Sequence, residues 1–129
     1  MVKAGLYLPD TNVLIYALSG VKPYSGWLEK WIRNNKLVLS SIVIAEFLSG
    51  ATKNEEKYFK VLLERFKILP VDENVAQVAA GYKRKFGKKS KKIWLSDCLI
   101  AATCKVFGAV LVTADRRDYP MRDILIDII

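Results

Sequence analysis

The sequence predicts an α/β domain in which a parallel β-sheet carries helices on both faces. Short apolar runs alternate with helical segments throughout the 129 residues, and this alternation is typical of parallel sheets with right-handed crossovers. The chain is 52% hydrophobic and contains neither an internal repeat nor a linker, so residues 1–129 are expected to form one domain with a substantial core. Ligands of such sheets bind beyond the carboxyl ends of the strands.

The first predicted strand is the apolar run Ala4–Leu8, which leads into Pro9 and Asp10. Proline suits the end of a strand, where its missing N–H matters least. Helices are predicted over Thr11–Leu18 and over Tyr24–Asn35, whose aromatic face is typical of core packing. Asp10 is therefore expected where a strand turns into a helix.

A second strand is predicted over Lys36–Ser40, and Ser41 can cap a helix over Ile42–Leu48. Glu46 interrupts the apolar run of that helix, and a glutamate buried there without a partner would be costly. Two interpretations of Glu46 remain open. It is either an exposed position on a short helix or a ligand that faces a site.

The central part of the chain predicts two further helices around the short strand Ile68–Leu69. The helix Asn54–Phe66 is amphipathic, and its i, i+3, i+4, i+7 face consists of Tyr58, Val61, Leu62 and Arg65. The charged residues of this helix lie on its other face and indicate a solvated surface. Asp72 can cap the next helix, which is expected to bury Val75, Val78, Ala79 and Tyr82.

A helix over Leu95–Phe107 is predicted to be buried against the sheet, because only Asp97 and Lys105 in it are charged. Ser96 can be its N-cap, which places Asp97 in the first turn, where the helix dipole favours a negative charge. A carboxylate at this position is either part of the cap or a functional acid.

The run Ala109–Val112 predicts a strand that ends in Thr113-Ala114-Asp115. A polar turn follows it, and a short last strand is predicted over Ile124–Ile128. Asp115 therefore follows the carboxyl end of its strand in the same way as Asp10 follows the first.

The chain contains no histidine and two cysteines. The absence of histidine excludes Ser-His-Asp triads, imidazole-pair nucleases and histidine-ligated zinc, and two cysteines cannot form a four-cysteine zinc site. Cys98 and Cys104 would lie about 9 Å apart along one helix, too far for a disulfide, and are expected to be buried thiols in a reducing compartment. Any metal must be held by oxygen, which points to Mg²⁺ or Mn²⁺.

Several other kinds of site lack their motifs. There is no G-x-G-x-x-G, no G-x-x-x-x-G-K-[ST] and no G-x-S-x-G in the chain. No apolar run approaches the roughly 18 residues of a bilayer span, and the N-terminus does not resemble a signal peptide. A cytoplasmic protein without a membrane partner is expected.

The formal net charge is +8, from 21 basic and 13 acidic residues, which suits a polyanionic partner such as nucleic acid. The segment Gly81–Lys92 has no acid and contains Lys83, Arg84, Lys85, Lys88, Lys89, Lys91 and Lys92. This stretch is either a solvated helix end with its loop or a phosphate-contacting patch, and its density favours the patch. Aromatic residues are few here, so base stacking is not indicated.

A single pocket at the carboxyl ends of the strands could hold four acids. Asp10 and Asp115 follow strands, whereas Glu46 and Asp97 lie on helices. Two carboxylates about 4 Å apart repel by roughly 4 kcal/mol at an effective dielectric of about 20, so four of them need a counter-charge. Mg²⁺ or Mn²⁺ would supply it, orient a water, lower its pKa and stabilise a phosphoryl transition state. A basic surface around such a pocket suits a polyanion that is cut at its centre.

These motifs resemble those of PIN-domain ribonucleases, and specifically the VapC-type toxins of toxin–antitoxin pairs. The matching residues are Asp10-Thr11-Asn12 after the first strand, Glu46 in A-E-F-L-S-G, Asp97 in S-D-C-L-I-A-A-T, and Thr113-Ala114-Asp115 followed by R-R-D-Y. Their order and spacing, and the total length, agree over nearly the whole chain. One departure is Trp94, where a smaller residue is expected, and it bears on the shape of the substrate.

The resemblance implies a three-layer α/β/α fold with a central parallel sheet of about five strands. It also implies a Mg²⁺- or Mn²⁺-dependent endoribonuclease that acts on structured RNA. The catalytic acids and metal ligands would be Asp10, Glu46, Asp97 and Asp115. Such toxins are commonly homodimers, neutralised by a VapB-like antitoxin whose segment reaches the active site.

Supporting roles follow from the same resemblance. Thr113 would hold the quartet by hydrogen bonding, Asn12 would orient Asp10, and Asp118 would be an accessory acid. Arg116 and Arg117, in the turn after the quartet's last acid, join the basic stretch as candidate RNA contacts.

Two other functions remain open. A PIN-like module that binds RNA or a partner without cutting it would explain the basic stretch, but such a module has no reason to keep four mutually repelling acids. A DNA- or flap-directed nuclease of the same superfamily is less favoured, because the chain lacks insertions that could grip a duplex.

Overall fold

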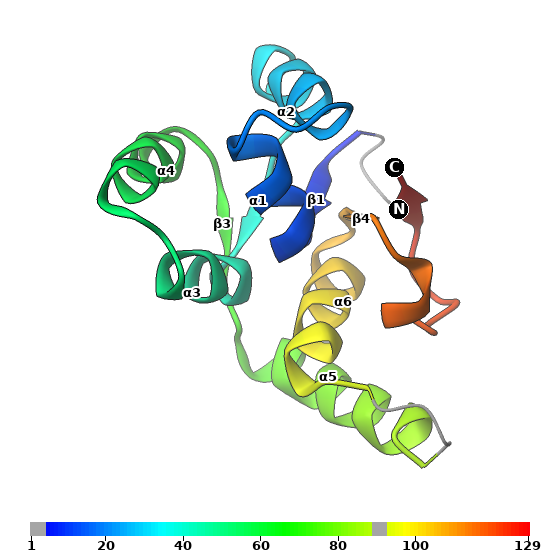
Figure 1. The fold of residues 1–129 in the computed structure, drawn as a ribbon. Coiled ribbons are helices and arrows are strands. Elements are labelled where there is room, and N and C mark those ends of the chain that lie inside the picture. The colour runs from blue at the N-terminus through cyan, green and yellow to red at the C-terminus, as the bar shows by residue number, and fades with distance from the viewer. Residues whose placement is uncertain (1–4, 89–92) are drawn as a thin grey trace.

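The computed structural model describes residues 5–88 and 93–129 (Figure 1). Along the chain its elements are β1 (Tyr7–Pro9), α1 (Thr11–Leu18), α2 (Tyr24–Arg33), β2 (Leu39–Ser40), α3 (Ser41–Ser49), α4 (Lys53–Arg65), β3 (Ile68–Leu69), α5 (Glu73–Phe86), α6 (Leu95–Phe107), β4 (Val110–Thr113), the 3₁₀ turn η1 (Arg116–Asp118) and β5 (Ile126–Ile128). None of the helices in these two ranges has the length and apolar character that crossing a bilayer requires.

The described strands are all parallel, as the sequence predicts. One ladder has the order β1-β4-β5, and a second pairs β2 with β3. The two ladders meet where Tyr7 of β1 bridges Leu37, just before β2. The carboxyl ends of β1 and β4 therefore lie side by side, because their parallel register sets Pro9 opposite Val112.

Burial explains why β4 and α6 lie at the centre of the molecule. All residues of β4 are buried, which is typical of a parallel strand covered on both faces. Helix α6 packs against β4 and α5. Helix α1 contacts β1 and β4, and α2 packs against α1 (Figure 1). Gly108 ends α6 at φ 73°, a left-handed conformation that glycine adopts without a steric penalty.

Several predicted boundaries are corrected. The first strand is Tyr7–Pro9 and not Ala4–Leu8, of which Ala4 lies outside the described residues. Pro9 is tolerated inside the strand, and the next ladder bond is made by the Asp10 N–H to the Val112 carbonyl, 2.9 Å away. The second strand is shorter than Lys36–Ser40 because only its last two residues pair with β3.

Two predicted helix caps are wrong. Ser40 and not Ser41 caps α3, since the Ser40 hydroxyl accepts the Val43 N–H at 3.1 Å. Ser96 already lies inside α6, whose N-cap residue is Trp94 and has no side-chain cap bond. Asp97 is therefore the third residue of α6 and still lies in its first turn.

The predicted buried face of α4 is also wrong, by one residue. Tyr58 is 73% exposed and Val61 is 61% exposed, whereas Phe59 is fully buried. The stripe that starts at Phe59 has the same periodicity as the predicted one, rotated by about 100°, and it is more apolar. Phe59 packs on Phe47 of α3, with ring centroids 4.4 Å apart.

The two cysteines agree with the prediction. Cys98 and Cys104 are free and buried on α6. They contribute to packing as small apolar side chains.

The face of α4 is tested by a pair of alanine variants. Phe59→Ala is expected to lower the free energy of unfolding by about 3–5 kcal/mol, because it empties a buried ring site. Tyr58→Ala should change it by less than about 0.5 kcal/mol, because most of that ring is already in solvent. Urea denaturation measures both, and equal effects would contradict the observed orientation of α4.

Candidate active site

A small cleft of about 120 Å³ opens at the carboxyl end of the sheet. Segments from four parts of the chain converge on it: the start of α1, the middle of α3, the start of α6 and η1 with the residue after it. The lining residues are Asp10, Thr11, Asn12, Glu46, Asp97, Ile100, Asp118 and Tyr119. The topological prediction that the acids gather beyond the ends of parallel strands is thus supported for three of the predicted quartet.

Asp10 is the most buried of these acids, with 4% of its surface exposed. One carboxylate oxygen accepts the Val13 N–H at 3.0 Å, so Asp10 is also the N-cap of α1. The other oxygen accepts the hydroxyls of Thr113 at 2.8 Å and Tyr119 at 3.2 Å. Burial raises the pKa of Asp10, and these hydrogen bonds offset part of that effect.

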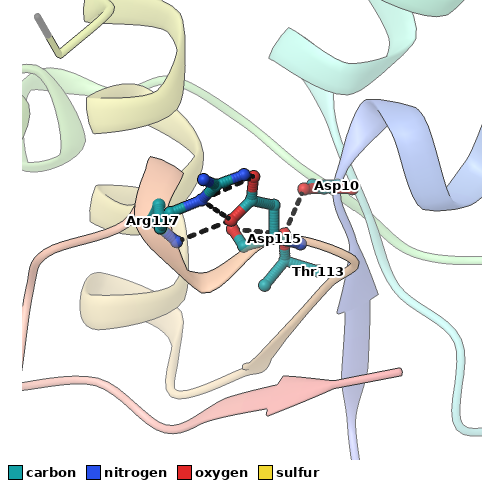
Figure 2. A network of polar contacts seen from close by, with 4 residues as sticks. All are labelled: Asp10, Thr113, Asp115 and Arg117. Atoms are coloured by element: carbon teal, nitrogen blue, oxygen red, sulfur yellow. Dashed lines mark hydrogen bonds and ion pairs between the residues drawn. The ribbon is translucent and has the colours of Figure 1, made fainter.

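Thr113 links Asp10 to Asp115 (Figure 2). Its fully buried hydroxyl donates to Asp10 and accepts the Asp115 N–H at 3.1 Å. The predicted supporting role of Thr113 therefore has a geometric basis. This single side chain fixes the end of β4 against the end of β1.

The Asp115 carboxylate is turned toward Arg117 and not toward Asp10 (Figure 2). It caps η1 by accepting the Arg117 N–H at 2.9 Å, and it pairs with the Arg117 guanidinium, with the shortest contact at 2.9 Å. Asp115 is absent from the lining of the cleft, whereas Asp118, which sequence reasoning treated as accessory, is part of that lining. The two acids lie on the same turn, three residues apart.

Glu46 lies in the cleft, half-buried, and accepts a hydrogen bond from the Thr11 hydroxyl. Of the two interpretations of Glu46, a side chain that faces the site agrees with this position. Asn12 also lines the cleft. Among the described contacts, however, Asp10 is oriented by the donors of Val13, Thr113 and Tyr119.

Tyr119 was not singled out by sequence reasoning. Its ring is buried, and its hydroxyl donates to Asp10 and also stabilises the Asp97 carboxylate. Burial and the nearby acids raise the pKa of this hydroxyl, so it acts only as a donor here. The only signal in the sequence is that an aromatic residue with a polar end follows the acidic turn.

Asp97 is buried close to several other acids of the cleft. Burial, and then the charges of Asp118, Glu46 and Asp10, raise its pKa from 3.8 to about 7. The pKa of Asp118 is also raised, first by burial and then by Asp115. The cleft therefore gathers more negative charge than it can hold at neutral pH without a counter-charge.

A hard divalent cation fits the donor set of this cleft. The described ligands are carboxylate, hydroxyl and amide oxygens, with no nitrogen or sulfur donor of the kind that zinc prefers. Within the two described ranges, no three acids converge closely enough to form a ready-made metal cage. Mg²⁺ does not require one, because it is usually held by one or two carboxylates and keeps several waters.

The predicted basic patch is only partly described. Lys83, Arg84, Lys85 and Lys88 are exposed at the end of α5, whereas Lys89, Lys91 and Lys92 lie outside the described residues. Arg116 donates to the Met121 carbonyl at 3.0 Å, and Arg117 is exposed apart from its pair with Asp115. An RNA-contacting role for these side chains stays a prediction.

The sequence of residues 7–123 matches the PIN-domain family model. The chain belongs to the PIN-domain family. It is 32% identical to ribonuclease VapC10 of Mycobacterium tuberculosis over 116 residues, which cover 90% of this chain and 87% of that protein. The family predicted from the four acidic motifs is therefore confirmed.

Solved structures agree with this PIN-domain assignment. The toxin–antitoxin complex from Klebsiella pneumoniae contains a chain that is 26% identical, with a TM-score of 0.71 over 88% of this chain and 90% of that one. DNA-bound VapBC from Salmonella typhimurium shares the fold, with a TM-score of 0.80 at 23% identity, over 95% of this chain and 96% of that one. The α/β fold with a parallel sheet is confirmed.

The Thr113 hydroxyl, which bonds both Asp10 and the Asp115 N–H, is expected to stabilise the fold more than an ordinary buried hydroxyl does. Thr113→Val should lower the free energy of unfolding by about 1–3 kcal/mol, because Asp10 loses a donor and the Asp115 N–H loses an acceptor. Thr103→Val is the matched control, since among the described contacts the buried Thr103 hydroxyl bonds just the Leu99 carbonyl of its own helix. Thermal or urea unfolding measures both, and an equal loss in the two variants would contradict this link.

The pKa of Asp97 predicts how stability depends on pH. The folded chain holds the Asp97 proton more tightly than the unfolded chain, so metal-free protein should lose stability as pH rises from about 4 to 7. Asp97→Asn removes this effect and should be more stable than the parent above about pH 7, by at most about 4 kcal/mol. Melting curves in a chelator at about pH 5 and about pH 8 measure the difference. If Asp97→Asn is no more stable than the parent at about pH 8, Asp97 does not have a raised pKa in the folded chain.

Proposed function

We propose that this PIN domain is a VapC-type toxin that hydrolyses phosphodiester bonds within RNA in a metal-dependent reaction. The observation that carries the proposal is the acidic cleft at the carboxyl end of the sheet, where burial and the charges of neighbouring acids raise the pKa of Asp97 and favour a counter-charge. A ribonuclease of the VapC group is 32% identical to this chain over a segment that covers 90% of it, and this similarity supports the same activity.

In this proposal Asp10, Glu46, Asp97 and Asp115 are the catalytic acids that hold Mg²⁺ or Mn²⁺. When bound, the ion supplies positive charge and an activated water at neutral pH. Asp10 is the fixed member, since three hydrogen bonds hold both of its carboxylate oxygens in place. Asp115 would contribute its carboxylate to the ion in place of its pair with the Arg117 guanidinium.

The supporting residues act on the acids. Thr113 and Tyr119 keep Asp10 in one orientation, and Asn12 contributes an amide at the rim. Asp118 adds a carboxylate inside the cleft, where it can accept a proton or hold an ordered water. Because no histidine is present in the chain, proton transfer must use carboxylates and water.

The proposed partners follow from charge and from the relatives. A formal charge of +8, with exposed basic residues at the end of α5, suits RNA. A VapB-like antitoxin is proposed because the solved neighbours include toxin–antitoxin complexes. A homodimer is proposed from the resemblance to VapC-type toxins alone. A cytoplasmic location is proposed from this substrate, together with two free thiols.

The function is tested by incubating the purified chain with total cellular RNA in Mn²⁺, in Mg²⁺ and in EDTA. Discrete fragments should form only with metal. Asp10→Asn and Asp97→Asn should each reduce cleavage by at least about 100-fold, because each removes a ligand while keeping the side-chain shape. Glu64→Gln is the control, since Glu64 is exposed on α4 and lies outside the cleft.

The outcomes distinguish the proposed nuclease from a module that binds RNA without cutting it. Full activity of Asp97→Asn would refute the proposed site. No fragments under any condition, together with a melting temperature that Mn²⁺ does not change, would favour a module that binds RNA without cutting it.

A further inference from the structure

Trp94 lies three residues before Asp97, an acid of the cleft, and has no part in the chemistry described so far. It is the N-cap residue of α6, one helical turn before Asp97. Its side chain is 60% exposed, and the neighbouring Leu95 is 52% exposed. A large apolar surface therefore stands in solvent next to a cleft lined by charged groups.

The backbone around Trp94 is held on both sides. Ile93 is buried, and its carbonyl accepts a hydrogen bond from the Lys83 ammonium group of α5. The Trp94 carbonyl accepts the Cys98 N–H at 3.1 Å, which is the first hydrogen bond of α6. The indole is therefore presented from a fixed backbone, so a ligand that binds it does not have to order the segment first.

The charges around Trp94 favour a polyanion over a protein segment. The Lys83 ammonium group bonds the carbonyl of Ile93, the residue before Trp94, and Arg84, Lys85 and Lys88 are exposed at the same end of α5. On the other side lies Asp97, where the proposed reaction takes place. Basic groups beside an exposed aromatic ring are the arrangement with which proteins bind single-stranded nucleic acid.

We propose that Trp94 stacks on an unpaired RNA base next to the phosphodiester bond that is cut. This inference rests on the proposed function and adds a binding residue to it: the base on which Trp94 stacks is unpaired, as in a loop, bulge or single strand. Bases inside a duplex have both faces covered by their neighbours, so they cannot stack on a protein ring. The ring is a binding residue and takes no part in bond cleavage.

Binding is measured on the full chain with Asp10→Asn, so that RNA is not consumed. The probes are a short oligoadenylate and the same strand in a duplex with oligouridylate. Trp94→Ala should weaken binding of the single strand by about 5- to 150-fold, as expected for the loss of one base–aromatic stack. Trp94→Phe should retain most of the affinity, because a phenyl ring also stacks. Tyr58→Ala is the control, as it removes an exposed aromatic side chain on α4 outside the cleft.

Tryptophan fluorescence provides a second readout that a structural role would not change. Oligoadenylate should quench the parent, and the quenching should be lost in Trp94→Phe although that variant still binds. Quenching that persists in Trp94→Phe would place the base on Trp27, the other tryptophan with a substantially exposed ring, and would overturn the inference. Equal affinity of Trp94→Ala and the parent for the single strand would overturn it as well.

Cleavage assays with the active chain separate this inference from the proposed function. If the parent cuts total RNA with metal and Trp94→Ala cuts it with an unchanged KM, only the stacking role fails. If the parent neither binds nor cuts RNA, both fail. If Trp94→Ala loses affinity for an antitoxin segment and not for oligoadenylate, Trp94 belongs to a protein interface and the stacking role is refuted.

Discussion

The hydrogen bond from Thr113 to Asp10 is the contact on which the arrangement of the site depends. It joins residues that are 103 positions apart and lie at the adjacent carboxyl ends of β1 and β4. The parallel register of these strands brings the two side chains together, and the bond then fixes the angle of the carboxylate. Asp10 also caps α1, so one acid couples the sheet, the first helix and the cleft. The orientation of Asp10 in the proposed site therefore depends on how the buried strands β1 and β4 pair.

The cleft shows how folding and function oppose each other at one place. Several carboxylates gathered around a small volume repel one another, and the rest of the fold must hold them there. That restraint comes from elements that contribute no charge: the buried strand β4, the apolar body of α6, and the Tyr119 ring beneath the acids. A counter-ion would then convert the repulsion into affinity for metal.

The sequence was sufficient to predict the parallel α/β class and a shared edge for Asp10 and Asp97, because a topological rule places strand ends and helix starts at one edge. Glu46 lies in the middle of α3, and its place in the cleft was one of two interpretations that the sequence left open. Sequence reasoning placed Asp115 in the quartet and Asp118 in an accessory role, whereas Asp118 lines the cleft and Asp115 pairs with Arg117. Both acids lie on one short turn, and sequence spacing does not show which of them faces the cleft. Tyr119 was missed because a buried hydroxyl leaves no periodic signal. The face of α4 was misjudged because two stripes fit the same period, and only tertiary packing on Phe47 selects Phe59.

The cap formed by Asp10 has a consequence for how this gene can lose its activity. Asp10 serves α1 as well as the cleft, so most replacements at this position damage folding. Asp97 forms no cap bond among the described contacts, and burial and neighbouring acids raise its pKa, so under the proposed function a neutral residue there should abolish activity and stabilise the chain. If the product harms its host, selection for survivors favours substitutions that leave a well-folded, inactive protein. Spontaneous escape alleles should therefore accumulate at codon 97 more often than at codon 10.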